Sequence, residues 1–216
     1  MAKDVVIPIV FPDYLIAVNT PEVKVKVPDY LPGIDILPDH FTIPKTKNRL
    51  PELGHAGVLF INGKTGLTKY YEYGRYDPQQ LGLVKRQTIS DVKIDGDGKP
   101  TAESLKKTLQ MISAKAGQHS RISAVYIEVT DKFDAMLKYA QGREIQNKNP
   151  HRPPYKLFTN NCIHFAKGVV EAAGVDTPWM VDPRPDSYIG EFRDDFPDLD
   201  YDPKSRSLQI EGIGKF

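Results

Sequence analysis

The chain carries a single cysteine, Cys162, and five histidines, the residue types that cysteine-based nucleophilic catalysis requires. A thiol attacks well only as a thiolate, and a helix N-terminus lowers the pKa of a thiol through its unpaired amides and positive dipole end. Apolar residues recur at helical spacing over 162–173 and Gly174 follows, which predicts a helix starting at Cys162. Any of the three preceding residues, Thr159, Asn160 and Asn161, can cap it. The thiol is therefore either a nucleophile or a small inert packing residue.

A thiolate catalyst also needs a group that accepts and returns a proton, usually histidine. His164 is nearest in sequence, but two positions along a helix rotate a side chain by about 200°, so it points away from Cys162. We interpret His164 as a buried supporting or packing residue. Three other histidines lie among proline- and glycine-marked segments and are expected to be solvated: His40, His119 and His151. His55 begins a β-rich run and is the predicted general base.

A β-hairpin is predicted to position His55. Residues 54–61 form its first strand, 62–66 a turn, and 67–73 a second strand. A turn centred near Lys64 places residues 71–73 opposite His55, where a carboxylate would orient the imidazole and favour its charged form. Glu72 is therefore the predicted third member of the site. A one-residue slip would instead bring Tyr71 or Tyr73 across.

The remaining pattern predicts a single catalytic domain, 1–216, of the α+β class. Further elements are expected as a strand within 84–94, a helix at 101–116, a strand at 121–129, a helix at 131–141 and a loop at 142–155. Residues 1–54 are rich in proline and predict an extended N-terminal arm with one short edge strand around Val23–Val27 and no central strand. Residues 176–216 predict a C-terminal tail that wraps the surface.

Composition excludes several classes of function. A net charge of +1 gives no global field toward nucleic acid or an anionic membrane, and no apolar run is long enough to span a bilayer. The first residues lack a secretory signal, so synthesis in the cytoplasm is expected. One cysteine excludes an internal disulfide and a multi-cysteine zinc site. The Asp95–Lys99 segment lacks the outer acidic ligands of a calcium loop, so neither metal nor cofactor is predicted.

The motif Gly54-His-Ala-Gly-Val58, followed far downstream by Asn161-Cys-Ile-His-Phe165, resembles the permuted papain-like group, which includes NlpC-type cell-wall peptidases and lecithin–retinol acyltransferase-like proteins. In that branch the histidine strand precedes the cysteine helix, as here. Residues 53–77 and the proline-rich leader are similar to the TseH-like amidases, antibacterial effectors of type VI secretion. The resemblance covers about residues 1–77 and 155–175. It implies an antiparallel sheet packed against the helix that bears the nucleophilic cysteine.

The resemblance also implies a reaction, in which Cys162 attacks a peptide amide of peptidoglycan and His55 transfers the proton. The Cys162 amide would help to bind the oxyanion, with Asn160, Asn161 or Tyr155 as the second donor. Four tyrosines either pack or line a cleft for sugar or peptide: Tyr70, Tyr71, Tyr73 and Tyr76. Trp179 either anchors a core or interface, or walls the active-site groove.

A secretion-machine carrier, a cognate immunity protein and action in the target-cell periplasm are implied in the same way. Two alternatives stay open. One is an acyltransferase or thioesterase acting on lipids, and the other is an inactive binding or immunity module.

Overall fold

The computed structural model describes residues 2–17, 23–26, 40–43, 49–50, 54–77, 79, 81–180 and 182–216. Its helices are α1 (Ala102–Lys115), α2 (Phe133–Ile145), α3 (Cys162–Ala172) and α4 (Pro185–Asp195), with a short 3₁₀ turn, η1 (Gln146–Lys148). Its strands are β1 (Asp4–Phe11), β2 (Ile16–Ala17), β3 (Val23–Lys26), β4 (His40–Ile43), β5 (Arg49–Leu50), β6 (His55–Ile61), β7 (Thr68–Gly74), β8 (Leu83–Gln87), β9 (Ile122–Val125), β10 (Ile127–Val129), β11 (Asp198–Asp202), β12 (Ser207–Ile210) and β13 (Gly214–Lys215).

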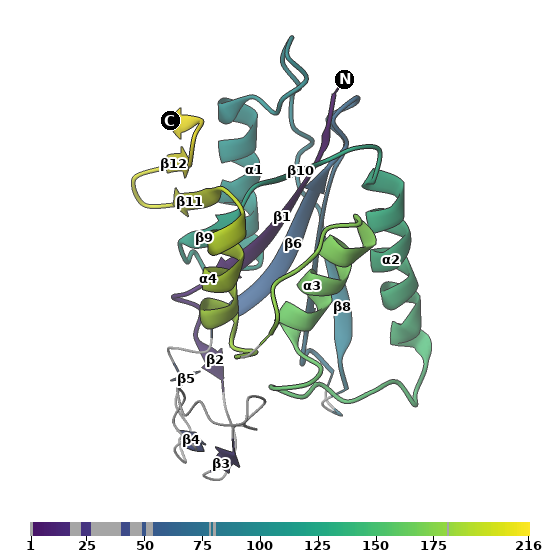
Figure 1. Ribbon diagram of the computed structural model, residues 1–216. Coiled ribbons are helices and arrows are strands. Elements are labelled where there is room, and N and C mark those ends of the chain that lie inside the picture. The colour runs from purple at the N-terminus through teal and green to yellow at the C-terminus, as the bar shows by residue number, and fades with distance from the viewer. Residues whose placement is uncertain are drawn as a thin grey trace.

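One large antiparallel sheet organises the chain (Figure 1). Its order is β13-β12-β11-β9-β1-β6-β7-β8, and β10 pairs with β1 alongside β9. Two further pairs, β2 with β5 and β3 with β4, form separate two-stranded sheets. The predicted short strand near Val23 is present, although Val27 lies outside the described residues. The predicted α+β class, with an antiparallel sheet packed against the cysteine helix, is confirmed.

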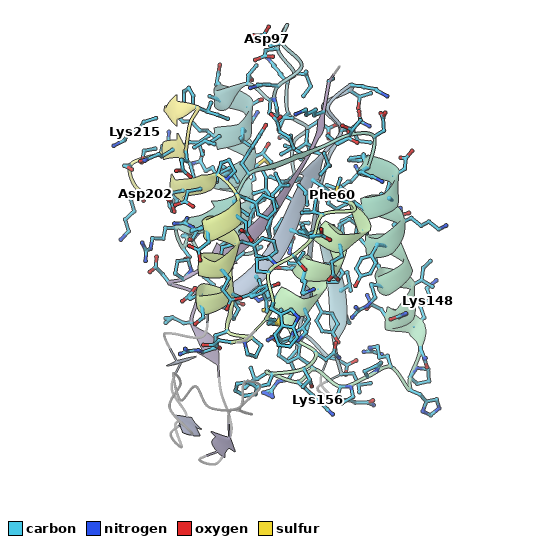
Figure 2. All side chains as sticks on the ribbon, viewed as in Figure 1. Phe60, Asp97, Lys148, Lys156, Asp202 and Lys215 are labelled. Atoms are coloured by element: carbon cyan, nitrogen blue, oxygen red, sulfur yellow. The ribbon has the colours of Figure 1, made fainter. Side chains whose placement is uncertain are left out.

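Helices cover both faces of this sheet, because side chains alternate between the faces along each strand. On one face α1 packs through Leu105, Leu109 and Ile112 against strand residues such as Ile7 and Leu59. On the other, α2, α3 and α4 pack on residues such as Val58 and Phe60. Phe60 is fully buried at the centre of that second layer (Figure 2). The helix that carries Cys162 therefore packs on the β6–β7 hairpin, in agreement with the sheet-against-helix arrangement that the resemblance implied.

The structure differs from the predicted N-terminal arm at β1, a central strand whose eight residues are all buried. The prolines of residues 1–54, among which Pro8 lies in β1, argued against a central strand, because proline cannot donate to a ladder. Its neighbouring strand, however, is interrupted between β9 and β10 at Tyr126, close to Pro8 in the register. The Tyr126 amide donates instead to the Pro197 carbonyl, at 2.9 Å. The missing donor thus coincides with a break in the ladder.

The structure also corrects the predicted C-terminal tail. Helix α4 begins with Pro185 in its first turn, and its Tyr188 and Phe192 are fully buried. Strands β11 and β12 then extend the main sheet through the pairing of β11 with β9. Their alternating buried residues, among them Leu199 and Tyr201, form part of the core on the α1 face. Residues 185–215 are therefore an integral part of the sheet and its helical layer.

Asp4, at the start of β1, fixes the position of the hairpin relative to α2. Its Oδ1 accepts the Gly63 amide of the β6–β7 turn at 2.9 Å. Its Oδ2 accepts the amides of Lys132 and Phe133 at 2.7 and 2.8 Å, where α2 begins. Because charge-assisted bonds to a buried carboxylate are short and strong, one side chain joins three segments of the fold.

None of the helices within the described residues is both long and apolar enough to cross a bilayer.

Candidate active site

Cys162 is the first residue of α3, and its thiol is almost completely buried, at 2% exposure. Of the three capping residues that the sequence offered, the structure uses Asn161. The Asn161 Oδ1 accepts the His164 amide at 3.1 Å, and its Nδ2 donates to the carbonyls of Pro183, at 2.8 Å, and Leu157. The cap fixes the start of α3 and so fixes the position of the thiol.

His164 supports this cap, and within the described residues no hydrogen bond joins its side chain to the thiol. Its Nδ1 lies 2.7 Å from the Asn161 Oδ1, so the imidazole adds a second donor to the capping oxygen. Burial, followed by the nearby Lys167 charge, lowers the pKa of His164. The imidazole is therefore neutral at pH 7, which agrees with its expected supporting role.

His55 is the first residue of β6, and its imidazole forms a hydrogen bond with the Cys162 thiol. Burial raises the pKa of the thiol, but the hydrogen bond and charge of His55 outweigh this effect, so the net pKa lies below the ordinary value of 9.0. Burial lowers the pKa of His55, but hydrogen bonds to Cys162 and Glu72 raise it to about 10. The two shifts favour a thiolate–imidazolium pair near neutral pH.

Glu72 holds the other side of the imidazole, with its Oε2 3.0 Å from the His55 Nε2. Both side chains are buried, and because Nε2 is taken, Nδ1 is the nitrogen left for the thiol. The Glu72 Oε1 accepts the Gln87 Nε2 at 2.9 Å, and the Tyr70 hydroxyl reaches Oε2 at 3.5 Å. Such a network fixes the carboxylate and, through it, the plane of the ring.

The hairpin register explains how His55 and Glu72 meet. Gly57, rather than His55, pairs with Glu72, so the register differs by two residues from a direct His55–Glu72 pair. An even shift preserves the face of each side chain, and a diagonal pair remains within reach of a long side chain. A Cβ on Gly57 would lie 2.1 Å from the Tyr70 hydroxyl, so glycine is required for Tyr70 to cross the strand toward Glu72.

Sequence reasoning missed the aromatic residues that enclose His55. The Tyr76 hydroxyl lies 3.0 Å from the His55 Nε2, and burial raises the pKa of this tyrosine, so it stays a neutral hydrogen-bonding group. The Tyr14 and Phe11 rings lie 4.9 and 6.2 Å from the imidazole, measured between centroids. Tyr76 had been considered only as packing or as a cleft tyrosine, because it follows the end of β7 and no strand periodicity places it.

Among the predicted oxyanion and substrate residues, Tyr155 is the one whose side chain forms a hydrogen bond with the thiol in the described part of the chain. Its hydroxyl lies 3.7 Å from the Cys162 Sγ, and burial raises its pKa. Asn160 donates to the Tyr73 hydroxyl and the Pro154 carbonyl, at 2.8 and 2.9 Å, and so braces the loop before α3.

The other candidates occupy structural positions. Asn161 is used as the cap. Tyr71 and Tyr73 lie on the α3 face, where Tyr71 stacks on Phe60 and Tyr73 on Phe165, away from the face that carries Glu72.

Two comparisons with known proteins identify what this chain is similar to. The model of a family described as type VI secretion system effector TseH-like matches residues 6–177. The crystal structure of the type VI secretion system effector TseH is similar to this chain, with a TM-score of 0.76 and 34% sequence identity. The likeness covers 97% of this chain and 98% of that one.

The chain belongs to the TseH-like family of type VI secretion effectors. The family resemblance read from the sequence is therefore confirmed, and the match is consistent with a papain-like fold. The family implies delivery by a secretion machinery toward target cells. A search of curated proteins gave no match.

In this TseH-like chain the thiol lies beside a small cavity of about 10 Å³, room for about one water molecule. Among the described residues, the cavity is lined on one side by Tyr155 and Leu157 before α3, and on the other by Pro183, Arg184 and Pro185 before α4. These residues border the buried thiol. Within the described parts of the chain, no three His, Cys, Asp or Glu side chains cluster as metal ligands would.

Glu72 is a positioning residue, and Glu72→Gln tests this role. The amide keeps the shape of the side chain but removes the charge that helps to hold the His55 pKa high. Because a positioned acid–base group contributes about 10²–10⁴-fold, we expect kcat/KM to fall by about 10²-fold. The alkaline limb of the pH–rate profile should also move to lower pH, since the imidazolium is lost as pH rises through the His55 pKa.

The matched control is Glu103→Gln, at an exposed position of α1. It should change neither the rate nor the profile. An unchanged alkaline limb in Glu72→Gln would contradict the positioning role, even if the rate fell.

Proposed function

We propose that the protein is a cysteine hydrolase that cleaves peptide amide bonds of peptidoglycan in the periplasm of a target bacterium. The observation that carries the proposal is the one thiol of the chain at the start of α3, hydrogen-bonded to an imidazole that Glu72 holds. Nucleophile, base and orienting carboxylate come from three elements and meet in a buried site, the arrangement that covalent acyl transfer requires. Membership of a type VI effector family supports an antibacterial target.

The proposed reaction has two halves. The Cys162 thiolate attacks the amide carbonyl, and the tetrahedral oxyanion is bound by the Cys162 backbone N–H, with the Tyr155 hydroxyl as second donor. The His55 imidazolium protonates the leaving amine as the C–N bond breaks, leaving a thioester. His55, now neutral, takes a proton from water, which attacks the thioester and releases the carboxylate and the thiolate. Substrate and water are the only species consumed.

The family also supports two partners for this proposal. A secretion-machine carrier would deliver the protein, and an immunity protein would protect the producing cell by covering or closing the site. The small cavity at Cys162 offers an immunity protein little to enter, so it would act on the surface around Tyr155 and Pro183–Pro185.

The test is digestion of purified peptidoglycan by the full chain in H₂¹⁸O, followed by glycan digestion and mass spectrometry of the muropeptides. We expect new fragments that carry one ¹⁸O in the newly formed carboxyl group, as hydrolysis of a thioester requires. The matched control is the Cys162→Ala variant, which lacks the single thiol of the chain. Unchanged muropeptides would refute the proposal, and acyl transfer to or from lipids would replace it with the lipid-acting alternative.

A further inference from the structure

A second concave region lies at the far end of α3 from the thiol. Its volume is about 850 Å³, and it is lined by Lys167, Glu171, Gly174, Val175, Asp176, Thr177, Pro178, Trp179 and Met180. We call it the Trp179 groove. The Trp179 side chain is 74% exposed, so it is not the core anchor that a lone tryptophan usually is. An indole left exposed beside a concave surface is a feature of ligand and partner sites.

Helix α3 joins the groove to the region of the thiol. Helix α3 runs from Cys162 at one end to Glu171 and Ala172 at the other, a rise of about 14 Å at about 1.5 Å per residue. The chain then turns at Gly174, which has a positive φ of 75°, and returns along the helix to α4 (Figure 1). Its Pro183 and Pro185 line the cavity at the thiol. An extended peptide covers about 14 Å in about four residues.

The chain segment that carries Trp179 is anchored to α3 and α4. The buried Tyr188 of α4 donates its hydroxyl to the Pro178 carbonyl at 2.6 Å, directly before Trp179. Thr177 donates to the Glu171 Oε1 at 3.2 Å, and Lys167 forms an ion pair with the same oxygen. Among the described residues, the second oxygen of Glu171 takes no bond. The groove therefore combines an exposed indole, on a backbone that Tyr188 anchors, with hydrogen-bonding groups at its rim.

This combination matches a sugar better than a peptide. A pyranose ring has an apolar C–H face that packs on an aromatic plane and a rim of hydroxyls that bond to carboxylates and hydroxyls. One lysine faces two carboxylates, Glu171 and Asp176, so the groove has no excess positive charge to attract a carboxylate-rich stem peptide. A neutral glycan is the ligand whose chemistry fits.

We propose that the Trp179 groove is a glycan subsite that binds the sugar backbone of peptidoglycan while a stem peptide extends along α3 toward Cys162. The placement of the stem peptide rests on the proposed hydrolase function, whereas binding of the glycan does not. Anchoring the polymer about 14 Å from the thiol would select cell-wall peptides over free peptides of similar sequence.

Trp179 is the only tryptophan in the chain, so intrinsic tryptophan fluorescence reports on this groove alone. The probe is a linear tetramer of β-1,4-linked N-acetylglucosamine, titrated into the full protein. We expect a saturable change in fluorescence, because a sugar ring on the indole excludes water from it. A fluorescence signal that does not change would overturn the proposal, and this outcome does not depend on whether the protein hydrolyses anything.

A second measurement uses variants on intact peptidoglycan. Trp179→Ala should weaken retention on sacculi by at least about tenfold, the scale of an aromatic anchor, while Trp179→Phe keeps a flat ring and retains part of the binding. The matched control is Ile145→Ala, another exposed apolar residue, 67% exposed, outside the groove. Where hydrolysis is observed, Trp179→Ala should lower kcat/KM on sacculi but not on a soluble stem peptide without sugar. Undiminished retention of Trp179→Ala, with loss of immunity-protein binding instead, would assign the groove to a protein partner.

Discussion

Replacing Cys162 with alanine should lower kcat/KM on peptidoglycan by about 10⁴-fold or more, the scale seen when a covalent nucleophile is removed. The chain has no second thiol to substitute for it. Cys162→Ser should be nearly as inactive, because a hydroxyl beside this histidine remains largely un-ionised. The measurement is the initial rate of muropeptide release with each purified variant.

The fold should survive these changes, since alanine and serine both fit at the first position of a capped helix. Circular dichroism and thermal unfolding should therefore match the wild type closely. Activity of Cys162→Ala within tenfold of wild type, in a folded protein, would remove Cys162 from the mechanism and return it to the role of an inert packing residue.

Replacing His55 with alanine should cost about 10²–10⁴-fold in kcat/KM, the contribution of a positioned acid–base group. The substitution should also change the pH titration of the Cys162 thiol, which can be followed by spectroscopy. Burial by itself raises the pKa of the Cys162 thiol, and His55 is the main cause that lowers it. Without His55, the pH at which the thiolate forms should move upward, to above the ordinary thiol value.

This shift is measured by the ultraviolet absorbance of the thiolate against pH, with the Cys162→Ala protein subtracted. That readout needs no reagent to reach the buried thiol. His151→Ala, a substitution in an exposed loop, is the matched control and should alter neither rate nor titration. A His55→Ala protein that still forms its thiolate at the wild-type pH would show that the imidazole does not activate the thiol.

Local signals in the sequence were sufficient to place the central pair. The helix start at Cys162 and the strand start at His55 each depend on apolar periodicity and glycine punctuation within a dozen residues, and the structure places both as predicted. Glu72 was found because strand faces alternate, so even a two-residue difference in register leaves it on the side of His55. These three positions could be predicted from the sequence because they depend on short-range patterns.

The features that the sequence did not predict depend on other contacts. Tyr76 and Gln87 reach the site only through the packing of β7 against β8 and the chain beyond, contacts that no single segment encodes. The apolar run of β1 is typical of a buried strand, but the proline content of residues 1–54 led to the prediction of an arm. Its tolerance depends on the break at Tyr126, more than a hundred residues away. The unpredicted site residues and the central position of β1 therefore both depend on partners that are distant in the sequence.

The central position of β1 also determines when the protein can fold. Asp4 pairs with Val129, and Phe11 with His55, so the first strand must wait for partners from the middle of the chain. Such distant pairings give a high contact order, which places folding in the range of about milliseconds to seconds rather than microseconds. During synthesis the eight apolar-rich residues of β1 leave the ribosome long before β9 and β10 can cover them. A nascent chain of this kind exposes an unpaired strand, so we expect β1 to be the part most in need of a chaperone.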